Sequence, residues 1–174
     1  MSETPLKKPA GSLSRDEFVA RYGGVYERSP WVAEAAFYKA RDISTLPALQ
    51  AAMRNIVDEA PEAQRLQLMR AHPDLTIAAA DISKLTAHSA AEQRGAGLLE
   101  CSPEEMNQFA ELNGGYKTKF GFPFIVAVKG MTRDDILAAF KRRIENSRAA
   151  EFKTALEQIH KIAAIRLAAL EEMN

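Results

Sequence analysis

Apolar residues recur every three or four positions along most of the chain, a spacing that predicts amphipathic helices. The clearest example runs from Leu46 to Val57, where Leu49, Met53 and Ile56 keep the same face before Pro61 ends the pattern. The same reasoning predicts further helices over Ser14–Tyr22, from Ser29-Pro30 onward, over Pro61–Arg70, and from Ser102, Thr132 and Ser147, the last running to about Glu171. The chain is therefore expected to be almost entirely helical.

Three Ser-x-x-Glu segments read as capping boxes, in which the two side chains satisfy free main-chain N–H groups at a helix start. They are Ser14–Glu17, Ser89–Glu92 and Ser102–Glu105. The run Asn113-Gly114-Gly115 is a candidate break in the helix that begins at Ser102. His72-Pro73 is expected to end the helix before it, because a residue that precedes proline resists helical geometry.

One segment departs from the helical period. Phe122–Val128 is a continuous apolar run that contains Pro123 and is too short to be assigned as a helix, and no partner strand occurs elsewhere in the chain. The predicted fold is an all-α, compact, single-domain helical bundle over residues 14–174, with an extended buried segment at about 122–128. Residues 1–13, which lack periodicity, are predicted to be a flexible N-terminal tail.

Composition narrows the class of protein. Lys plus Arg and Asp plus Glu both number 23, so a formal net charge of zero predicts neither a nucleic-acid nor a membrane partner. The single cysteine, Cys101, cannot form an internal disulfide, which favours a reducing compartment. Met1–Ser14 has no apolar centre of the kind found in signal peptides. We expect a soluble, cytoplasmic protein.

Motifs for zinc proteases, phosphate-binding loops and serine hydrolases are absent from the sequence. His72, His88 and His160 are too scattered to suggest a metal site. No metal and no cofactor are predicted, so any chemistry falls to side chains and backbone. His72 could be a general acid or base held by the adjacent proline, or could only cap the last carbonyls of its helix.

Three further features have both a structural and a functional interpretation. Ser89 and Glu92 could serve only as a cap, although a helix N-terminus can also receive an anionic ligand. Arg166 falls in the middle of the apolar stripe of the last helix, so its guanidinium needs either a ligand or an internal ion pair with an Asp or Glu. The unpaired backbone of the 122–128 segment could bind a flat ligand or be satisfied by packing.

In order and spacing, several segments resemble the 2-oxo-4-hydroxy-4-carboxy-5-ureidoimidazoline (OHCU) decarboxylase family. The resemblance covers about Leu13 to Leu170. Its markers are Ser29-Pro30-Trp31, His72-Pro73-Asp74-Leu75, Ser89-Ala90-Ala91-Glu92-Gln93 with Ala96-Gly97-Leu98, Lys119-Phe120-Gly121-Phe122-Pro123-Phe124-Ile125, and Arg166. The resemblance implies an all-α fold, commonly a homodimer, that converts OHCU to (S)-allantoin and CO2 without a cofactor.

By this resemblance the catalytic pair is His72 and Glu92. The substrate-binding positions it implies are Pro73, Ser89, Gln93, Phe124, Ile125, Val126, Ala127, Val128 and Arg166. The chain departs from the family pattern at Thr76-Ile77-Ala78, where many members carry a glycine and a basic residue, and this difference concerns the shape of the loop.

Two other interpretations stay open at the level of sequence. The first is a non-catalytic helical ligand-binding module, in which His72 and Glu92 are caps and Arg166 belongs to an internal ion pair. The second is a lyase or hydrolase that acts on another purine breakdown product.

Overall fold

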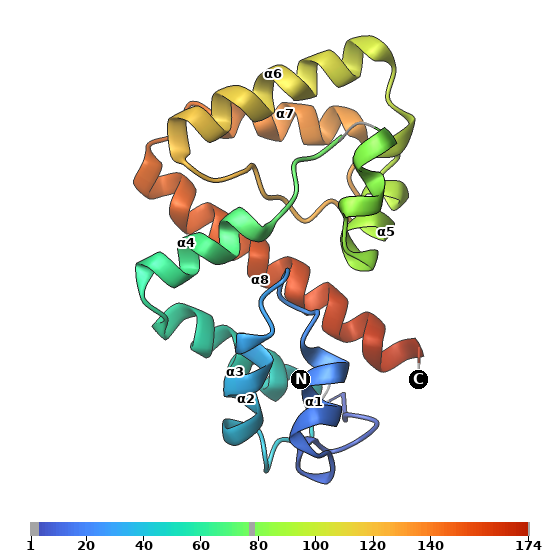
Figure 1. The fold of residues 1–174 in the computed structure, drawn as a ribbon, viewed down its shortest axis with the longest axis vertical. Coiled ribbons are helices and arrows are strands. Elements are labelled where there is room, and N and C mark those ends of the chain that lie inside the picture. The colour runs from blue at the N-terminus through green and yellow to red at the C-terminus, as the bar shows by residue number, and fades with distance from the viewer. Residues whose placement is uncertain (1–3, 77–78, 174) are drawn as a thin grey trace. The chain divides into compact units, whose positions relative to one another are not determined.

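The computed structural model describes residues 4–76 and 79–173, and over these ranges it is all-α (Figure 1). An isolated bridge between Pro5 and Thr45 is the sole β-type pairing in the described chain. The helices are α1 (Arg15–Tyr22), α2 (Trp31–Lys39), α3 (Leu46–Glu59), α4 (Glu62–Ala71), α5 (Ala87–Gly95), α6 (Pro103–Phe120), α7 (Arg133–Arg143) and α8 (Arg148–Met173), with short 3₁₀ turns at Ala10–Ser12, Ala79–Lys84 and Leu98–Glu100. The predicted all-α fold is confirmed.

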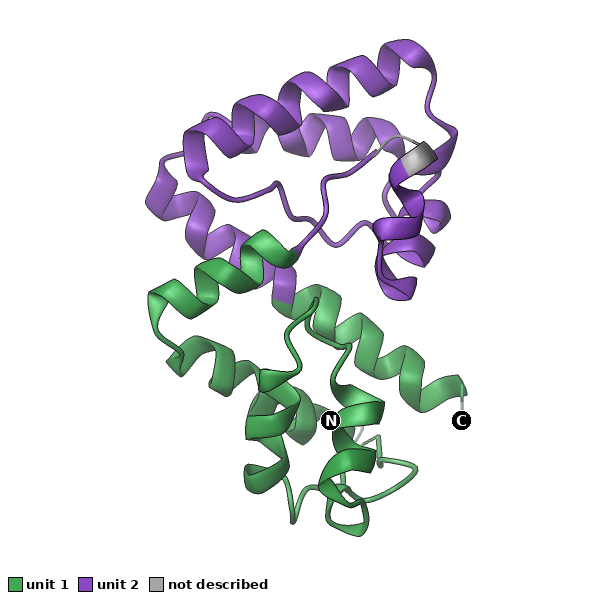
Figure 2. Cartoon of the chain, viewed as in Figure 1, with its two compact units in different colours: residues 1–71, 160–174 green, residues 72–159 purple. Residues whose placement is uncertain are grey.

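Two compact units make up the chain (Figure 2). Unit 1 comprises Met1–Ala71 and His160–Asn174, and unit 2 comprises His72–Ile159. Helix α8 contributes its first part to unit 2 and the remainder to unit 1. That residues 14–174 form a single domain stays a prediction.

Unit 1 has a core built from α1, α2 and α3, with α1 against α2 and α2 against α3. The ring of Phe18 lies edge-on to Tyr22 and Phe37, at centroid distances of 4.8 and 5.7 Å. The predicted apolar face of α3 is buried, as shown by Leu49 and Met53. Helix α3 forms because this face can be removed from water, which supplies most of the stability of an amphipathic helix.

Unit 2 has an aromatic core centred on Tyr116 of α6. Its ring contacts Phe120, Phe122, Phe124 and Phe140 at centroid distances between 4.4 and 6.0 Å. Phe124 also stacks on Phe140 of α7 at 3.9 Å. The segment after α6 is therefore held by its own aromatic side chains, and no helical turn forms over residues 123–128. The predicted extended buried segment is confirmed.

Two of the three predicted capping boxes are confirmed. Ser14 with Glu17 and Ser102 with Glu105 cap α1 and α6 in the expected reciprocal manner. The predicted box at Ser89–Glu92 is wrong. Helix α5 begins at Ala87, and the Thr86 side chain accepts from the Ser89 N–H at 3.2 Å. Thr86 supplies the cap one turn earlier, so Ser89 and Glu92 lie inside the helix.

The candidate break at Asn113-Gly114-Gly115 does not occur, and α6 continues to Phe120. Glycine is only weakly unfavourable within a helix, at about 1 kcal/mol relative to alanine. Packing of the buried Phe109 and Tyr116 on either side outweighs this cost.

The described part of the N-terminal segment packs within unit 1. Leu6, Ala10 and Leu13 are buried, and the Leu6 N–H donates to the Ser44 carbonyl at 2.7 Å. The Lys7 N–H also donates to the Glu171 carboxylate at 2.8 Å. Residues 4–13 thus contribute apolar side chains to the core although they show no helical period, whereas the first three residues of the predicted tail lie outside the described residues.

Candidate functional site

His72 is the first residue after α4 and the first residue of unit 2. Its side chain is buried, with a relative exposure of 9%. Helix α4 ends at Ala71, as Pro73 predicts, because the residue before proline is driven out of the helical region. The imidazole is therefore held in a largely dehydrated position, with a proline fixing the chain that follows.

Gln93 joins the loop after His72 to helix α5. Its side-chain Nε2 donates to the Asp74 carbonyl at 3.0 Å, and its Oε1 accepts from the Thr76 N–H at 3.1 Å. The Gln93 side chain is 2% exposed. The structure thus brings together the two motifs that the sequence analysis singled out, the one that begins at His72 and the one that ends at Gln93.

Ser89 and Glu92 lie on α5 together with Gln93. Ser89 is buried and Glu92 is half-buried. Since Thr86 caps the helix, neither residue has the capping role that the sequence left open. The purely structural interpretation of this pair loses its main support.

Helix α6 holds the same loop from another direction. Asn113 donates from Nδ2 to the Leu75 carbonyl at 3.0 Å, and Lys117 forms an ion pair with Asp74 at 2.6 Å. On the adjacent turn, the ring of Tyr116 contacts Phe124. One helix therefore positions both the loop after His72 and the start of the extended segment.

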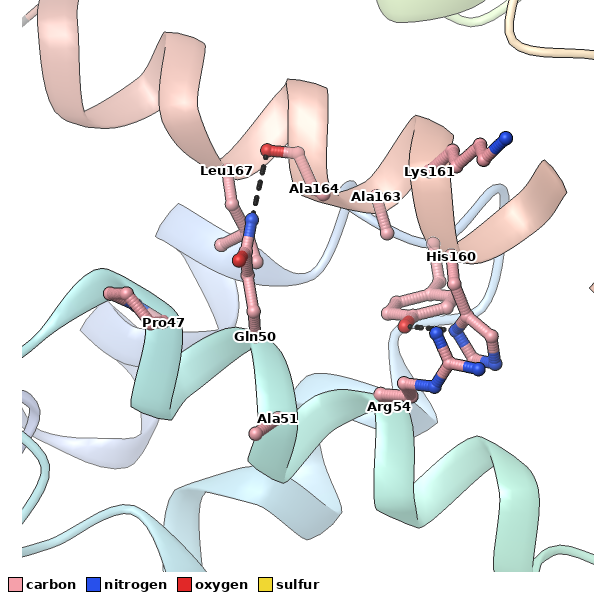
Figure 3. A pocket seen from close by; sticks show the side chains of 10 residues that line it. Pro47, Gln50, Ala51, Arg54, His160, Lys161, Ala163, Ala164 and Leu167 are labelled. Atoms are coloured by element: carbon pink, nitrogen blue, oxygen red, sulfur yellow. Dashed lines mark hydrogen bonds between the residues drawn. The ribbon is translucent and has the colours of Figure 1, made fainter. Parts of the chain in front are cut away.

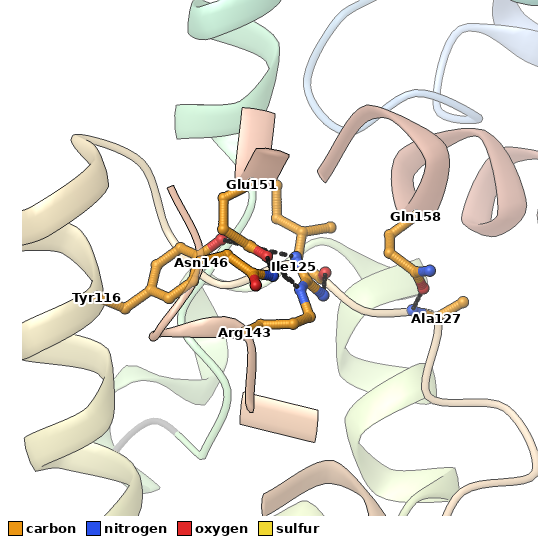
Figure 4. Close-up of polar contacts among 7 residues, drawn as sticks. All are labelled: Tyr116, Ile125, Ala127, Arg143, Asn146, Glu151 and Gln158. Carbon is orange, nitrogen blue, oxygen red and sulfur yellow. Dashed lines mark hydrogen bonds and ion pairs between the residues drawn. The ribbon is translucent and has the colours of Figure 1, made fainter. Parts of the chain in front are cut away.

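The extended segment is held through two main-chain groups (Figure 4). Arg143 of α7 donates from Nη1 to the Ile125 carbonyl at 2.6 Å. The Ala127 N–H donates to Oε1 of Gln158 on α8 at 3.0 Å. Phe124, Ile125 and Val128 are buried, whereas Val126 and Ala127 are half-buried. The backbone of this segment is anchored through side chains rather than through a sheet.

Arg143 is itself held by the carboxylate of Glu151, which is fully buried. Its Nε and Nη2 donate to this carboxylate at 2.9 to 3.2 Å, and Asn146 and Tyr116 donate to it as well (Figure 4). Burial by itself raises the pKa of Glu151, but these donated hydrogen bonds outweigh it and the pKa lies below 4.5. Burial raises the pKa of the Tyr116 phenol, which stays protonated as a donor. The network is an ionic anchor for the Ile125 carbonyl.

Thr76 adopts a backbone φ of 54°, in the left-handed region that favours glycine. Its hydroxyl is buried and makes no hydrogen bond with the part of the chain that the structure describes. The departure from the family pattern thus begins at a position whose geometry suits glycine. Ile77 and Ala78, the rest of that departure, lie outside the described residues.

Arg166 belongs to unit 1, unlike the other predicted site residues. Its Nη2 lies 2.9 Å from the Glu27 carboxylate, and its Nη1 donates to the carbonyls of Gly24 and Val25 at 3.4 Å. The internal ion pair that the sequence analysis weighed against a ligand role is therefore present. Binding of substrate by Arg166 stays a prediction.

A cavity of about 340 Å³ lies in unit 1 between α3 and the C-terminal part of α8 (Figure 3). The side chains of Gln50, Arg54, His160 and Leu167 line it. None of the predicted site residues does. In its wall, the His160 ring lies between the Tyr26 hydroxyl and the Asp58 carboxylate, 2.9 Å from each. Because a carboxylate only accepts, Nε2 of His160 carries the proton and Tyr26 donates to Nδ1 when the ring is neutral.

Residues that hold the candidate site were missed by sequence reasoning. Asn113 was treated as a helix breaker, and neither Arg143 nor Gln158 was singled out. Arg143 carries a signal comparable to that of Arg166, since it follows Ile136, Ala139 and Phe140 on the apolar face of α7. Gln158 carries no such signal, because a half-buried glutamine on a long helix is common.

Two kinds of feature are absent from the described residues. No cluster of three or more His, Cys, Asp or Glu side chains is arranged to hold a metal ion. No described helix combines the length and the apolar character that crossing a membrane requires.

Comparison with known proteins gives consistent matches. Residues 11–168 match the family model described as OHCU decarboxylase. The chain is 44% identical to the 2-oxo-4-hydroxy-4-carboxy-5-ureidoimidazoline decarboxylase of Haloferax volcanii, over 97% of this chain and 96% of that protein.

Two crystal structures are also similar to this chain. The first is that of (S)-allantoin synthase, with a TM-score of 0.75 and 36% identity, covering 92% of this chain and about half, 52%, of that one. The second is that of OHCU decarboxylase in the presence of (S)-allantoin, with a TM-score of 0.68 and 26% identity, covering 90% of this chain and 98% of that one. From its matched length and its identity to these relatives, the chain belongs to the OHCU decarboxylase family.

Proposed function

We propose that this protein decarboxylates OHCU to (S)-allantoin in urate degradation, as a carboxy-lyase. The observation that carries the proposal is the double hydrogen bond of Gln93 to the main chain of Asp74 and Thr76. It joins the loop of His72 to the helix of Glu92, the two residues for which the family resemblance implies catalytic roles.

His72 and Glu92 handle the proton in this proposal. His72 acts on or near the substrate hydroxyl and carboxylate, and Glu92 orients it. Burial of His72 supports this role, because a general acid or base acts most effectively where water does not compete for its proton. Pro73, Ser89, Gln93 and the main chain of 124–128 contact the substrate, as does Arg166.

The chemistry needs no cofactor in this proposal. Loss of CO2 breaks a C–C bond and leaves an electron pair on the ring carbon. That carbon also bears the hydroxyl and is adjacent to the imine carbon, so the pair delocalises toward the imine nitrogen and an enol forms. The nitrogen and one face of the former imine carbon are then protonated, and the hydroxyl loses its proton to become the carbonyl of allantoin. The substrate supplies the electron sink that pyridoxal phosphate supplies elsewhere. The protein has to hold the ring and direct the proton.

We propose a homodimer in the cytoplasm with a small ureidoimidazoline as its substrate and neither nucleic acid nor membrane as a partner. The balanced charge and the single cysteine support the proposed location and the absence of such partners, and the homodimer is what the family resemblance implies.

The stereochemistry of the product tests the proposed function. OHCU loses CO2 unaided, and free in water the intermediate is protonated on either face, so the product is racemic. We expect catalytic amounts of the protein, added to freshly generated OHCU, to yield dextrorotatory (S)-allantoin. A preference of about 100:1 needs only ~2.7 kcal/mol between the two faces. Circular dichroism follows the reaction.

The alternatives give different results in this experiment. A non-catalytic ligand-binding module leaves the slow racemic background unchanged, which would refute the proposal. A lyase for another purine breakdown product also fails to accelerate OHCU decay. A racemic product formed at an accelerated rate would mean that the ring is not held as proposed.

A further inference from the structure

In the extended segment, side chains of α7 and α8 form hydrogen bonds with main-chain groups of two residues that are two positions apart. Arg143 binds the Ile125 carbonyl, and Gln158 binds the Ala127 N–H. In an extended chain the N–H and C=O of one residue point to the same edge, and those of the next residue point to the opposite edge. Ile125 and Ala127 are two positions apart, so their main-chain groups lie on the same edge of the segment. Arg143 and Gln158 both bind the segment along this edge.

Val126 lies between these residues, and the same alternation assigns its N–H and C=O to the opposite edge. Neither group forms a hydrogen bond with any residue in the described ranges. Val126 is half-buried, so the pair is not fully exposed to water. Further along the same edge, the Val128 carbonyl already accepts from the Met131 N–H at 3.0 Å. Val126 therefore offers a donor and an acceptor side by side.

Such a pair matches one class of chemical group. A cyclic urea or a cis amide presents an adjacent N–H and C=O, and two hydrogen bonds form when these meet the C=O and N–H of one extended residue, as in an antiparallel ladder. The imidazolone ring and the ureido group of OHCU both carry edges of this kind.

We propose that Gln158, together with the Arg143–Glu151 pair, is a positioning residue that orients the segment so that Val126 receives a urea edge of the substrate. This role rests on the proposed function. Gln158 acts through Ala127, and Arg143 acts through Ile125, while the Glu151 carboxylate keeps the guanidinium in place. Without these anchors the segment can rotate, and the donor and acceptor of Val126 no longer face the ring.

Substitutions at Gln158 test the role. Gln158→Met keeps the length of the side chain and removes the acceptor for Ala127, whereas Gln158→Glu keeps an acceptor. The matched control is Gln50→Met in unit 1. Gln50 donates to the Ala164 carbonyl at 3.3 Å, so this change also removes one bond between a side chain and the main chain.

For Gln158→Met we expect KM for OHCU to rise about tenfold, the effect of losing ~1.4 kcal/mol of substrate binding. The enantiomeric excess of the product falls as well, because a misplaced ring meets the proton on both faces. Gln158→Glu should have a KM within about threefold of the wild-type value and a wild-type enantiomeric excess, because its carboxylate can still accept from the Ala127 N–H. Gln50→Met should have the KM and the enantiomeric excess of the wild-type protein. A purely structural role of Gln158 would instead lower the melting temperature and leave KM and enantiomeric excess unchanged.

Arg143→Lys provides a second test if Gln158→Met does not fold. Lysine can still pair with Glu151 but cannot also reach the Ile125 carbonyl with a second donor. The same rise in KM and loss of enantiomeric excess are expected. Wild-type values of both in a folded Gln158→Met or Arg143→Lys variant would overturn the positioning role while the proposed function stands. A wild-type protein that does not accelerate OHCU decay would overturn the function and this role with it.

Discussion

Arg166 and Glu27 form a buried ion pair in unit 1, with 2.9 Å between Nη2 and Oε2 and side-chain exposures of 2% and 1%. Each charge depends on the other, because removing one partner leaves an uncompensated charge in the interior. The pair also explains how an arginine can lie in the middle of the apolar stripe of α8.

We expect Arg166→Met to lower the free energy of unfolding by about 3–5 kcal/mol, the usual cost of stranding one partner of a buried pair. Adding Glu27→Leu should recover most of this loss, since the double variant buries no charge. Urea unfolding measures both.

The activity of the stable double variant then tests the predicted contact of Arg166 with substrate. If turnover persists, Arg166 has only a structural role. If it is lost, the arginine also binds substrate, and Arg166→Lys should then reduce kcat/KM more than tenfold because lysine cannot form two parallel hydrogen bonds.

His72→Asn should reduce turnover of OHCU by about 10²–10⁴-fold, as expected when a positioned acid–base group is lost. The helical content should not change, because α4 ends at Ala71 through Pro73 rather than through the imidazole. His88→Asn on α5 is the matched control and should retain activity. Wild-type turnover by a folded His72→Asn variant would contradict the proposed mechanism.

Glu92→Gln should impair activity more than stability, because glutamine keeps the size of the side chain and an oxygen that can accept hydrogen bonds, while the charge is lost. Thr86, not Glu92, belongs to the cap of α5, so the change removes a charge without removing a cap. Thr86→Ala is the complementary variant and should destabilise the protein by about 1 kcal/mol. Normal activity of Glu92→Gln would remove Glu92 from the catalytic pair.

Acid should weaken unit 2 through Glu151. Its folded-state pKa lies below its ordinary value of 4.5, so the stabilisation is complete above that pH and is lost as the pH falls through the lowered pKa. Glu151→Gln should therefore be much less stable than the wild-type protein at neutral pH, by about 3–5 kcal/mol, because Arg143 is left buried without its charge partner. The difference should shrink below the folded-state pKa. Urea midpoints at several pH values measure this, with the exposed Glu111→Gln as a control that should show no such trend.

Thr76→Gly should stabilise the protein by about 1 kcal/mol. A β-branched residue at φ 54° is strained by roughly 1–2 kcal/mol, and glycine removes this strain at an entropic cost of roughly 0.5–1 kcal/mol. The change also removes a buried hydroxyl that has no partner in the described chain. Thr76→Ala separates the two effects, because alanine loses the hydroxyl but keeps the Cβ at positive φ. A glycine variant that is less stable than the alanine variant by roughly 0.5–1 kcal/mol, the entropic cost alone, would show that the backbone is not strained.

The sequence alone determined the parts of this protein that depend on neighbouring residues. The apolar period of α3, the caps at Ser14 and Ser102 and the stop before Pro73 are local, because hydrogen bonds and steric limits act over a few positions. The extended segment could also be predicted, because an apolar run with a proline suits neither a helix nor an unpaired strand. The family could be recognised for the same reason, since the order and spacing of its marker segments are properties of the chain.

Tertiary structure decided whatever depends on partners far away in sequence. Ser89–Glu92 matches a capping box as well as Ser102–Glu105 does, but Thr86 caps α5 one turn earlier. Asn113 does not break α6, and its side chain donates to the Leu75 carbonyl, 38 positions away. Likewise, the partner of Arg166 lies near the other end of the chain, and that of Ala127 lies on α8. A buried charge or a free N–H predicts that a partner exists, because leaving it unpaired is costly. Only the folded chain determines which residue that partner is.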